Sequence, residues 1–181
     1  WRSQKTNSFF KKCNYRGTLI EHLILQNLTQ FYNVGDHNYI RLEGADWNDG
    51  LDMASQCGES VAFSCMYASN LNKLAKFMRL SGEKEIRLFE EMRLLFKPCN
   101  YESVKTKKEI LHKYFCAVEN GIRGKAILSK SGNIADDLES KAQWMIKNIR
   151  RNEWLKEGFF NGYYDNRNRR VEGKKAGKIR M

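Results

Sequence analysis

The sequence of 181 residues has only one proline, no long apolar run and no signal peptide, and each of these absences excludes a class of protein. It holds a single proline, and 41% of its residues are hydrophobic, which together exclude a disordered chain and favour an ordered, helix-rich one. No apolar run approaches the roughly 18 residues needed to span a bilayer, so no membrane contact is expected. The chain begins at Trp1, with neither an initiator methionine nor a signal peptide, which indicates a piece of something longer.

Metal ligands are also scarce. The chain has five cysteines and three histidines, and none of them form a Cys-x-x-Cys pair or have the spacing of another known metal-ligand motif. We therefore expect no metal and no cofactor. Because the number of cysteines is odd and none of them form a Cys-x-x-Cys pair, we expect free thiols and a cytoplasmic protein.

Positive charge is in excess, with a formal net charge of +11. One interpretation is an anionic partner such as nucleic acid or a phosphate-bearing ligand. The other, which we favour, is a solvated surface on a protein whose acidic remainder is missing. Much of the charge lies on predicted helices, as at Lys105, Lys107 and Lys108, or near the C-terminus.

Apolar residues recur with helical spacing in five segments. These predict helices over residues 18–32, 58–80, 83–96, 103–118 and 134–154. Thr18 and Glu21 have the spacing of a capping box. Residues 159–171 combine aromatics and turn formers and predict a short irregular hairpin, while Ser129 and Ser131 fall in a predicted loop. The pattern favours an all-α architecture in which long loops carry the function.

One such loop, residues 42–52, concentrates acidic side chains around a tryptophan: Leu-Glu-Gly-Ala-Asp-Trp-Asn-Asp-Gly-Leu-Asp. A calcium loop of the EF-hand type would need different residues at its glycine and final glutamate positions, where this chain has Leu51 and Cys57. Nucleic-acid binding needs the opposite charge, so nucleic acid is not the expected ligand of this loop. A purely structural role, with an aspartate capping a helix, accounts for one or two residues of the cluster.

Carbohydrate chemistry accounts for more of the loop. Glycosyl transfer needs a carboxylic acid beside the glycosidic oxygen, with its pKa raised by an apolar neighbour or a nearby negative charge. Asp49 has both available, from Trp47 and Asp46. An inverting hydrolase also needs a second carboxylate to activate water, but inorganic phosphate is already anionic and needs no such base.

The loop resembles a known family. The residues that carry the resemblance are Gly44-Ala45-Asp46-Trp47-Asn48-Asp49-Gly50-Leu51-Asp52, then Gly58-Glu59-Ser60-Val61 opening a helix, and a later stretch over residues 153–165. Together they are similar to glycoside hydrolase family 94, the cellobiose and oligoglucan phosphorylases formerly classed as glycosyltransferase family 36. The variant Leu51-Asp52-Met53-Ala54 favours an oligoglucan phosphorylase, such as one for β-1,2-linked chains.

The resemblance implies an (α/α)₆-barrel catalytic domain and an enzyme that carries out inverting, reversible phosphorolysis of a β-linked gluco-oligosaccharide to a sugar 1-phosphate. Inorganic phosphate is then a co-substrate. Asp49 corresponds to the general acid, and Trp47 lines the sugar subsite. The remaining candidate substrate-binding residues are Asp46, Asn48 and Glu59, and helix capping is an equal alternative for Glu59.

The five predicted helices are fewer than a six-hairpin barrel requires. Residues 1–181 are therefore expected to be a fragment of one catalytic domain, with flexible basic ends at 1–16 and 172–181. Its partners would be the remainder of that domain, the oligosaccharide and phosphate. The isolated fragment is expected to be inactive and to self-associate through uncovered apolar surface. The alternative function is a non-catalytic helical module that binds carbohydrate or an anionic polymer.

Overall fold

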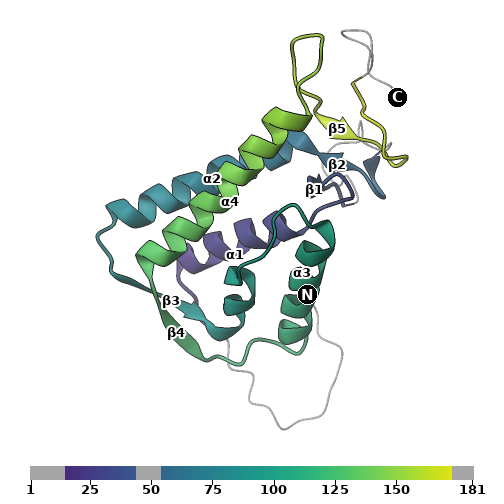
Figure 1. Cartoon of the computed structure of the whole chain (residues 1–181). Helices are drawn as coiled ribbons and strands as arrows, with labels where there is room; N and C mark the ends of the chain where they lie inside the picture. Colours follow the sequence, from purple (N-terminus) through teal and green to yellow (C-terminus); the bar gives the residue numbers. More distant parts are fainter. Residues whose placement is uncertain (1–14, 44–53, 173–181) are drawn as a thin grey trace.

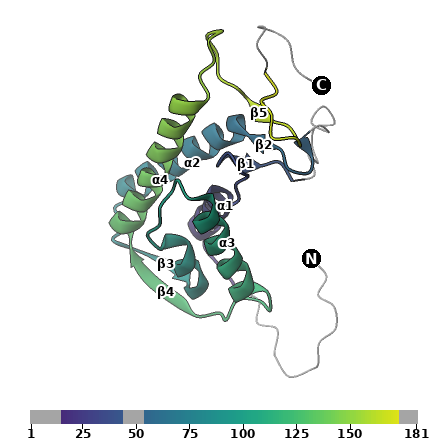
Figure 2. The same cartoon turned by 45° about the vertical axis from the view of Figure 1, so that its right-hand side comes forward.

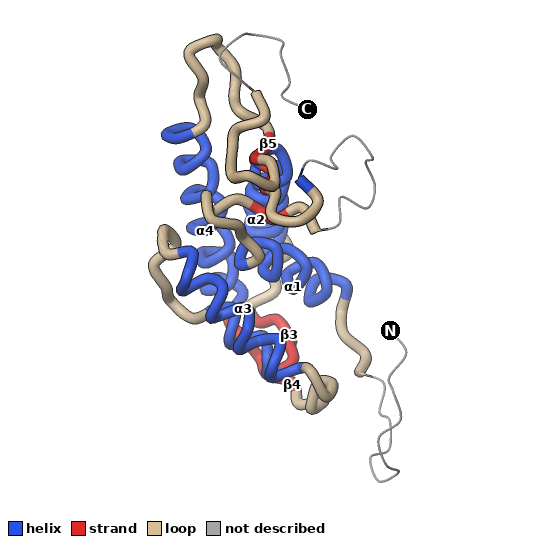
Figure 3. Tube along the Cα trace, turned by 90° about the vertical axis from the view of Figure 1, so that its right-hand side faces the viewer, coloured by secondary structure: helices blue, strands red, loops and turns tan. Residues whose placement is uncertain are grey.

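The computed structural model describes residues 15–43 and 54–172, and this part of the chain is mostly helical. Helices α2 and α4 lie side by side, with α1 packed against α2 and α3 packed against α1 (Figures 1 and 2). The α-helices and the 3₁₀ helix η2 in the described ranges are α1 (Leu19–Tyr32), α2 (Val61–Leu80), η2 (Glu90–Phe96), α3 (Val104–Val118) and α4 (Ser131–Asn152). The helix-rich character expected from the sequence is confirmed (Figure 3), but the all-α prediction is not fully correct, because the described ranges also contain two small antiparallel sheets.

The helix starts follow from local capping. The Thr18 hydroxyl accepts a hydrogen bond from the Glu21 amide at 3.2 Å, and the Glu21 carboxylate accepts one from the Thr18 amide at 3.3 Å. The predicted capping box of α1 is thus confirmed. Ser60 caps α2 and Ser103 caps α3 in the same manner, each accepting from the amide three residues later.

The prediction of a single helix over residues 83–96 is wrong. Residues in this stretch form strand β3 (Glu85–Phe89) followed by η2, and β3 pairs antiparallel with β4 (Ala126–Lys130), which was predicted as loop. In β3 the buried Ile86 and Leu88 alternate with exposed residues, which is the strand period of two. Helix α4 also begins at Ser131, directly after β4, rather than near residue 134.

A second small sheet lies at one end of α2 and α4 (Figure 1). Its strands are β1 (Ile40–Arg41), β2 (Glu59–Ser60) and β5 (Tyr163–Tyr164), in the order β1-β2-β5 and antiparallel throughout. Beyond β5 the chain turns back so that the Val171 amide donates to the Tyr163 carbonyl at 3.0 Å. The hairpin predicted for residues 159–171 is confirmed in this form.

Two lysine side chains lie inside the helical core. Lys107 of α3 and Lys141 of α4 have almost no exposed surface, although the sequence placed Lys107 with solvated charges. Lys107 Nζ lies 4.1 Å and 4.0 Å from the ring centroids of Phe31 and Trp144, and it donates to Asn38 Oδ1 at 2.9 Å. Lys141 Nζ is paired with the Asp137 carboxylate.

Among the described helices, none combines the length and apolar character needed to cross a membrane. Cys57, Cys65, Cys99 and Cys116 carry free thiols, and Cys13 lies outside the described ranges.

Candidate functional site

The acidic loop lies in the segment between β1 and β2, residues 42–58, and from here the name covers that whole segment. The structure brings its two ends together. The Leu42 amide donates to the Gly58 carbonyl at 2.9 Å, and the Gly58 amide donates to the Ala54 carbonyl at 2.9 Å. The loop therefore leaves the three-stranded sheet and returns to it at the start of α2. Asp46, Trp47, Asn48 and Asp49 lie outside the described residues, so their assigned roles stay predictions.

Glu59 is the predicted site residue whose surroundings are described. Its side chain is fully buried, and Oε1 accepts hydrogen bonds from the amide and Nδ1 of His37 at 2.9 and 2.8 Å. Oε2 accepts from the Tyr39 amide at 2.9 Å. These bonds fasten the turn between α1 and β1 to the first strand after the acidic loop. Ser60, rather than Glu59, caps α2, and the substrate-binding prediction for Glu59 is left untested.

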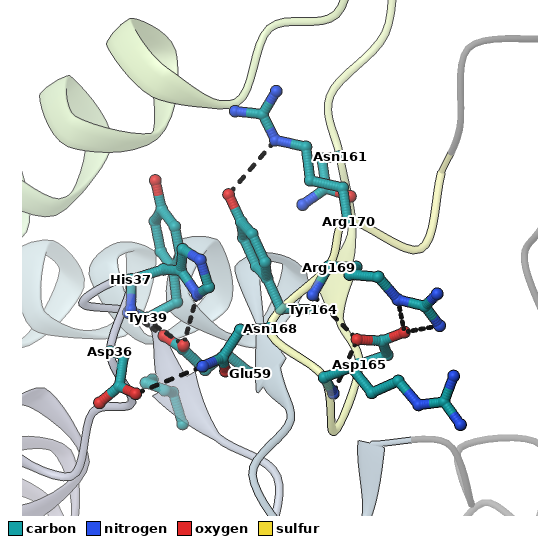
Figure 4. A network of polar contacts seen from close by, with 12 residues as sticks. Asp36, His37, Tyr39, Glu59, Asn161, Tyr164, Asp165, Asn168, Arg169 and Arg170 are labelled. Carbon is teal, nitrogen blue, oxygen red and sulfur yellow. Dashed lines mark hydrogen bonds and ion pairs between the residues drawn. The ribbon is translucent and has the colours of Figure 1, made fainter.

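His37 is held on a second side by an aromatic ring. Its imidazole lies beside the ring of Tyr164 (Figure 4), and the two rings stack with 3.7 Å between the ring centroids and 17° between the planes. The ring nitrogen Nδ1 contacts Glu59 while the face of the ring lies on Tyr164, and together these contacts fix the orientation of the imidazole. His37 thus links β5 to the turn that leads into β1.

A second buried carboxylate, Glu153, lies at the end of α4. It accepts from the Tyr164 hydroxyl at 2.8 Å and from Asn161 Nδ2 at 3.0 Å, and Arg170 Nε lies 3.4 Å away. Burial, followed by interactions with Glu153, raises the pKa of Tyr164 to about 12, although Arg170 opposes the shift. The phenol is therefore a stable hydrogen-bond donor at neutral pH.

A third carboxylate, Asp165, organises the turn after β5 (Figure 4). Its Oδ1 accepts from the amides of Arg167 and Arg169 at 2.9 and 2.8 Å, and its Oδ2 accepts from the Arg169 guanidinium at 2.9 and 2.7 Å. Burial opposes ionisation, but the Arg169 contacts outweigh it and hold the pKa of Asp165 below its usual value.

The three buried carboxylates near the loop ends are thus already engaged within the protein. Glu59 holds amides and an imidazole, Glu153 a phenol and an amide, and Asp165 an arginine and two amides. Within the described ranges, no group of His, Cys, Asp and Glu is arranged to hold a metal ion. This arrangement can hold the acidic loop in position. Because these three carboxylates already accept hydrogen bonds within the protein, the proton donor is expected in the loop itself.

Asn166 is a site residue that the sequence reasoning missed. Its Oδ1 accepts from the amides of Gln56 and Cys57 at 2.8 and 2.9 Å, which ties the turn after β5 to the end of the acidic loop. A signal was present, because Asn166 directly follows the stretch 153–165 that carried part of the family resemblance. What the sequence could not show is that residues more than a hundred positions apart meet.

A groove of about 990 Å³ lies elsewhere, between α2 and α4. Its lining includes the basic side chains of Lys76, Lys147, Arg150 and Arg151. The loop ends described above are not among the residues that line it.

The fold and site define a mostly helical domain in which a small antiparallel sheet fastens an acidic loop at the helix ends. Residues 7–94, just under half of the chain, match the glycosyl hydrolase 94 superfamily, catalytic domain, and this match supports a segment of such a catalytic domain. The match confirms the resemblance seen in the sequence and supports a catalytic domain of the glycoside phosphorylase type. The chain matches no curated protein.

Proposed function

We propose that this chain belongs to an inverting glycoside phosphorylase that cleaves a β-linked gluco-oligosaccharide with inorganic phosphate. The observation that carries the proposal is that the family match over residues 7–94 spans the whole acidic loop. The fixed ends of that loop give further support, since a catalytic acid must be held in one position to act. In the same proposal the helices belong to an (α/α)₆ barrel, which the packing of α2 against α1 and α4 supports.

In this proposal Asp49 is the general acid. A phosphate oxygen attacks the anomeric carbon from the face opposite the leaving sugar, and the bond from that carbon to the glycosidic oxygen breaks. The Asp49 carboxyl gives its proton to the departing oxygen, so the products are a shortened saccharide and a sugar 1-phosphate of inverted configuration. Phosphate replaces the activated water of a hydrolase, and no second catalytic carboxylate is needed.

Trp47 supplies the flat apolar face on which a sugar ring stacks in this proposal. Three polar residues surround it in this proposal and either contact sugar hydroxyls or shape the loop: Asp46, Asn48 and Glu59. Glu59 shapes the loop, because its carboxylate contacts His37 and Tyr39.

Replacement of the proposed acid is the direct test. In the protein that carries this chain at its full length, Asp49→Asn should lower phosphorolysis of β-linked gluco-oligosaccharides by roughly 10²–10⁴-fold, because the amide cannot donate the required proton. Sugar 1-phosphate formation measures the forward reaction, and phosphate release from a sugar 1-phosphate donor measures the reverse. An aryl β-glucoside with an acidic phenol should recover much of the rate, since its leaving group needs no proton.

Asp136→Asn is the matched control, because Asp136 is an exposed aspartate of α4 paired with Arg79, away from the loop ends. It should keep wild-type rates on every substrate. Wild-type activity in Asp49→Asn, with circular dichroism showing an intact fold, would refute the assignment of Asp49.

A further inference from the structure

The second end of the acidic loop is held by one side-chain oxygen from a distant part of the chain. Asn166 Oδ1 accepts from two successive amides, those of Gln56 and Cys57, at 2.8 and 2.9 Å. Both bonds use the amide oxygen as an acceptor of backbone donors. The position of residues 56–57 therefore depends on an acceptor at position 166.

The turn that carries Asn166 is itself rigidly built. Asp165 binds the amides on the far side of the turn and the Arg169 side chain, as described above, and the Asp165 amide donates to the Arg169 carbonyl at 2.9 Å. Asn168 adopts a positive φ of 58° in this turn, and its amide donates to the Asp165 carbonyl at 3.0 Å. An Asn166 side chain mounted on such a turn is restricted in position.

The turn is also connected to the first residues after the loop. In the sheet, Tyr164 lies opposite Glu59 and Tyr163 opposite Ser60, and the Val61 amide donates to the Gly162 carbonyl at 2.8 Å. Tyr164 is in turn held by Glu153 at the end of α4. Asn166, β2 and the start of α2 therefore form one connected unit, against which residues 56–57 are fixed.

We propose that Asn166 is a positioning residue for the acidic loop. By fixing residues 56–57 to the β2-β5 unit, it sets where the acidic loop returns to the sheet, and through the backbone it supports the proposed catalytic step. This inference rests on the proposed role of Asp49 as general acid. Asn166 acts through the backbone and need not touch the substrate.

Two substitutions separate the acceptor from the rest of the side chain. Asn166→Leu has nearly the same shape and no acceptor, whereas Asn166→Asp keeps an oxygen that accepts from both amides. Arg167→Ala is the control in the same turn, because the Arg167 side chain is exposed. Hydrogen–deuterium exchange of the amides of residues 56 and 57 reports on the clamp, and phosphorolysis kinetics of the full-length protein report on its effect.

In Asn166→Leu the two amides should exchange about tenfold faster or more, since each loses a hydrogen bond. The kcat should fall by roughly 10- to 100-fold, with KM within about twofold of wild type, because misplacement of a catalytic group affects the reacting step. Asn166→Asp should restore both the exchange rate and most of kcat. Arg167→Ala should leave both unchanged.

Unchanged exchange in Asn166→Leu would overturn the clamp. Faster exchange with an unaltered kcat would overturn the positioning role. The exchange measurement does not depend on catalysis, so it separates failure of the clamp from failure of the proposed function, which full activity in Asp49→Asn would reveal.

Discussion

Lys107 shows how a single buried charge adjusts to its surroundings. Its ammonium group lies between the rings of Phe31 and Trp144 and has one hydrogen bond, to Asn38. Cation–π contact offsets part of the cost of leaving water. Burial, with repulsion from Lys141, still lowers the pKa of Lys107 from 10.5 to about 7. The folded protein therefore loses a proton from this residue near neutral pH.

This shift predicts a pH-dependent stability. In the unfolded chain the Lys107 amine stays protonated up to about pH 10.5, whereas in the folded chain it loses its proton near pH 7. Between these values the unfolded state binds more protons, so the contribution of Lys107 to the free energy of unfolding rises with pH, by up to about 1.4 kcal/mol per pH unit. Below pH 7 both states are protonated and this contribution is constant.

Urea denaturation of wild type and Lys107→Met at pH 7, 8, 9 and 10 measures the effect. The variant should lack that part of the pH slope, because methionine fills the same core position without a titrating group. Lys105→Met, at an exposed position on the same helix, should keep the wild-type slope. Equal slopes in wild type and Lys107→Met would contradict the prediction.

At the scale of the elements, the turn from α1 into β1 depends on a close contact between the backbone at Gly35 and the side chain of Glu59. The Gly35 amide donates to the Tyr39 carbonyl at 2.9 Å, and the Glu59 carboxylate lies directly against Gly35. A Cβ at position 35 would lie 2.3 Å from Glu59 Cδ and 2.4 Å from Cγ. Since Glu59 is fully buried and held by three hydrogen bonds, it has little room to move.

Gly35→Ala should therefore destabilise the protein, by roughly 1–3 kcal/mol, because it overpacks a buried site. Gly132→Ala is the matched control: an added Cβ there meets no atom within 4 Å, and alanine in helix α4 should be neutral or stabilising by up to about 1 kcal/mol. Urea titration of both variants and of the wild type measures the free energy of unfolding and tests this prediction. A Gly35→Ala protein as stable as wild type would show that Glu59 can move aside.

At the scale of the whole molecule, apolar surface and net charge act in opposite directions. Several large apolar side chains are exposed, among them Phe77 and Leu80 at the end of α2, with Leu80 at 86% exposure. Such surface favours association with other protein surface. The net charge of +11 keeps like molecules apart, and salt screens that repulsion.

We therefore predict that the chain self-associates and that association strengthens as salt is raised from about 20 mM to 500 mM, a range over which the screening length falls severalfold. Sedimentation velocity over a range of protein concentrations measures it. Phe77→Lys with Leu80→Lys should shift the distribution toward monomer, whereas Lys73→Ala, at a polar position of α2, should not. A compact monomer under all conditions would contradict the prediction.

The same salt titration tests the alternative function. Binding of an anionic polymer, for which the basic groove between α2 and α4 is the candidate surface, would weaken as salt rises, because it releases counterions. Self-association through apolar surface changes in the opposite direction.

Much of the helical part of the fold could be predicted from local features. The capping box at Thr18 and the apolar spacing of α1, α2 and α3 specify those helices with information a few residues apart. Residues 83–96 were mispredicted because Ile86, Phe89 and Met92 also fit a helix. Their strand forms because residues 126–130 are available to pair with it, and pairing over that separation leaves no local signal.

The candidate site divides in the same way. The sequence by itself determined the acidic loop and its resemblance to a family, since residue types and spacing within one short segment carry that chemistry, and the match over residues 7–94 confirms the resemblance. Only the tertiary structure decided what holds the loop: the turn at His37 bound to Glu59, and Asn166 bound to residues 56–57. Those contacts join segments from three parts of the chain, and they exist only once the helices have packed and the small sheet has formed.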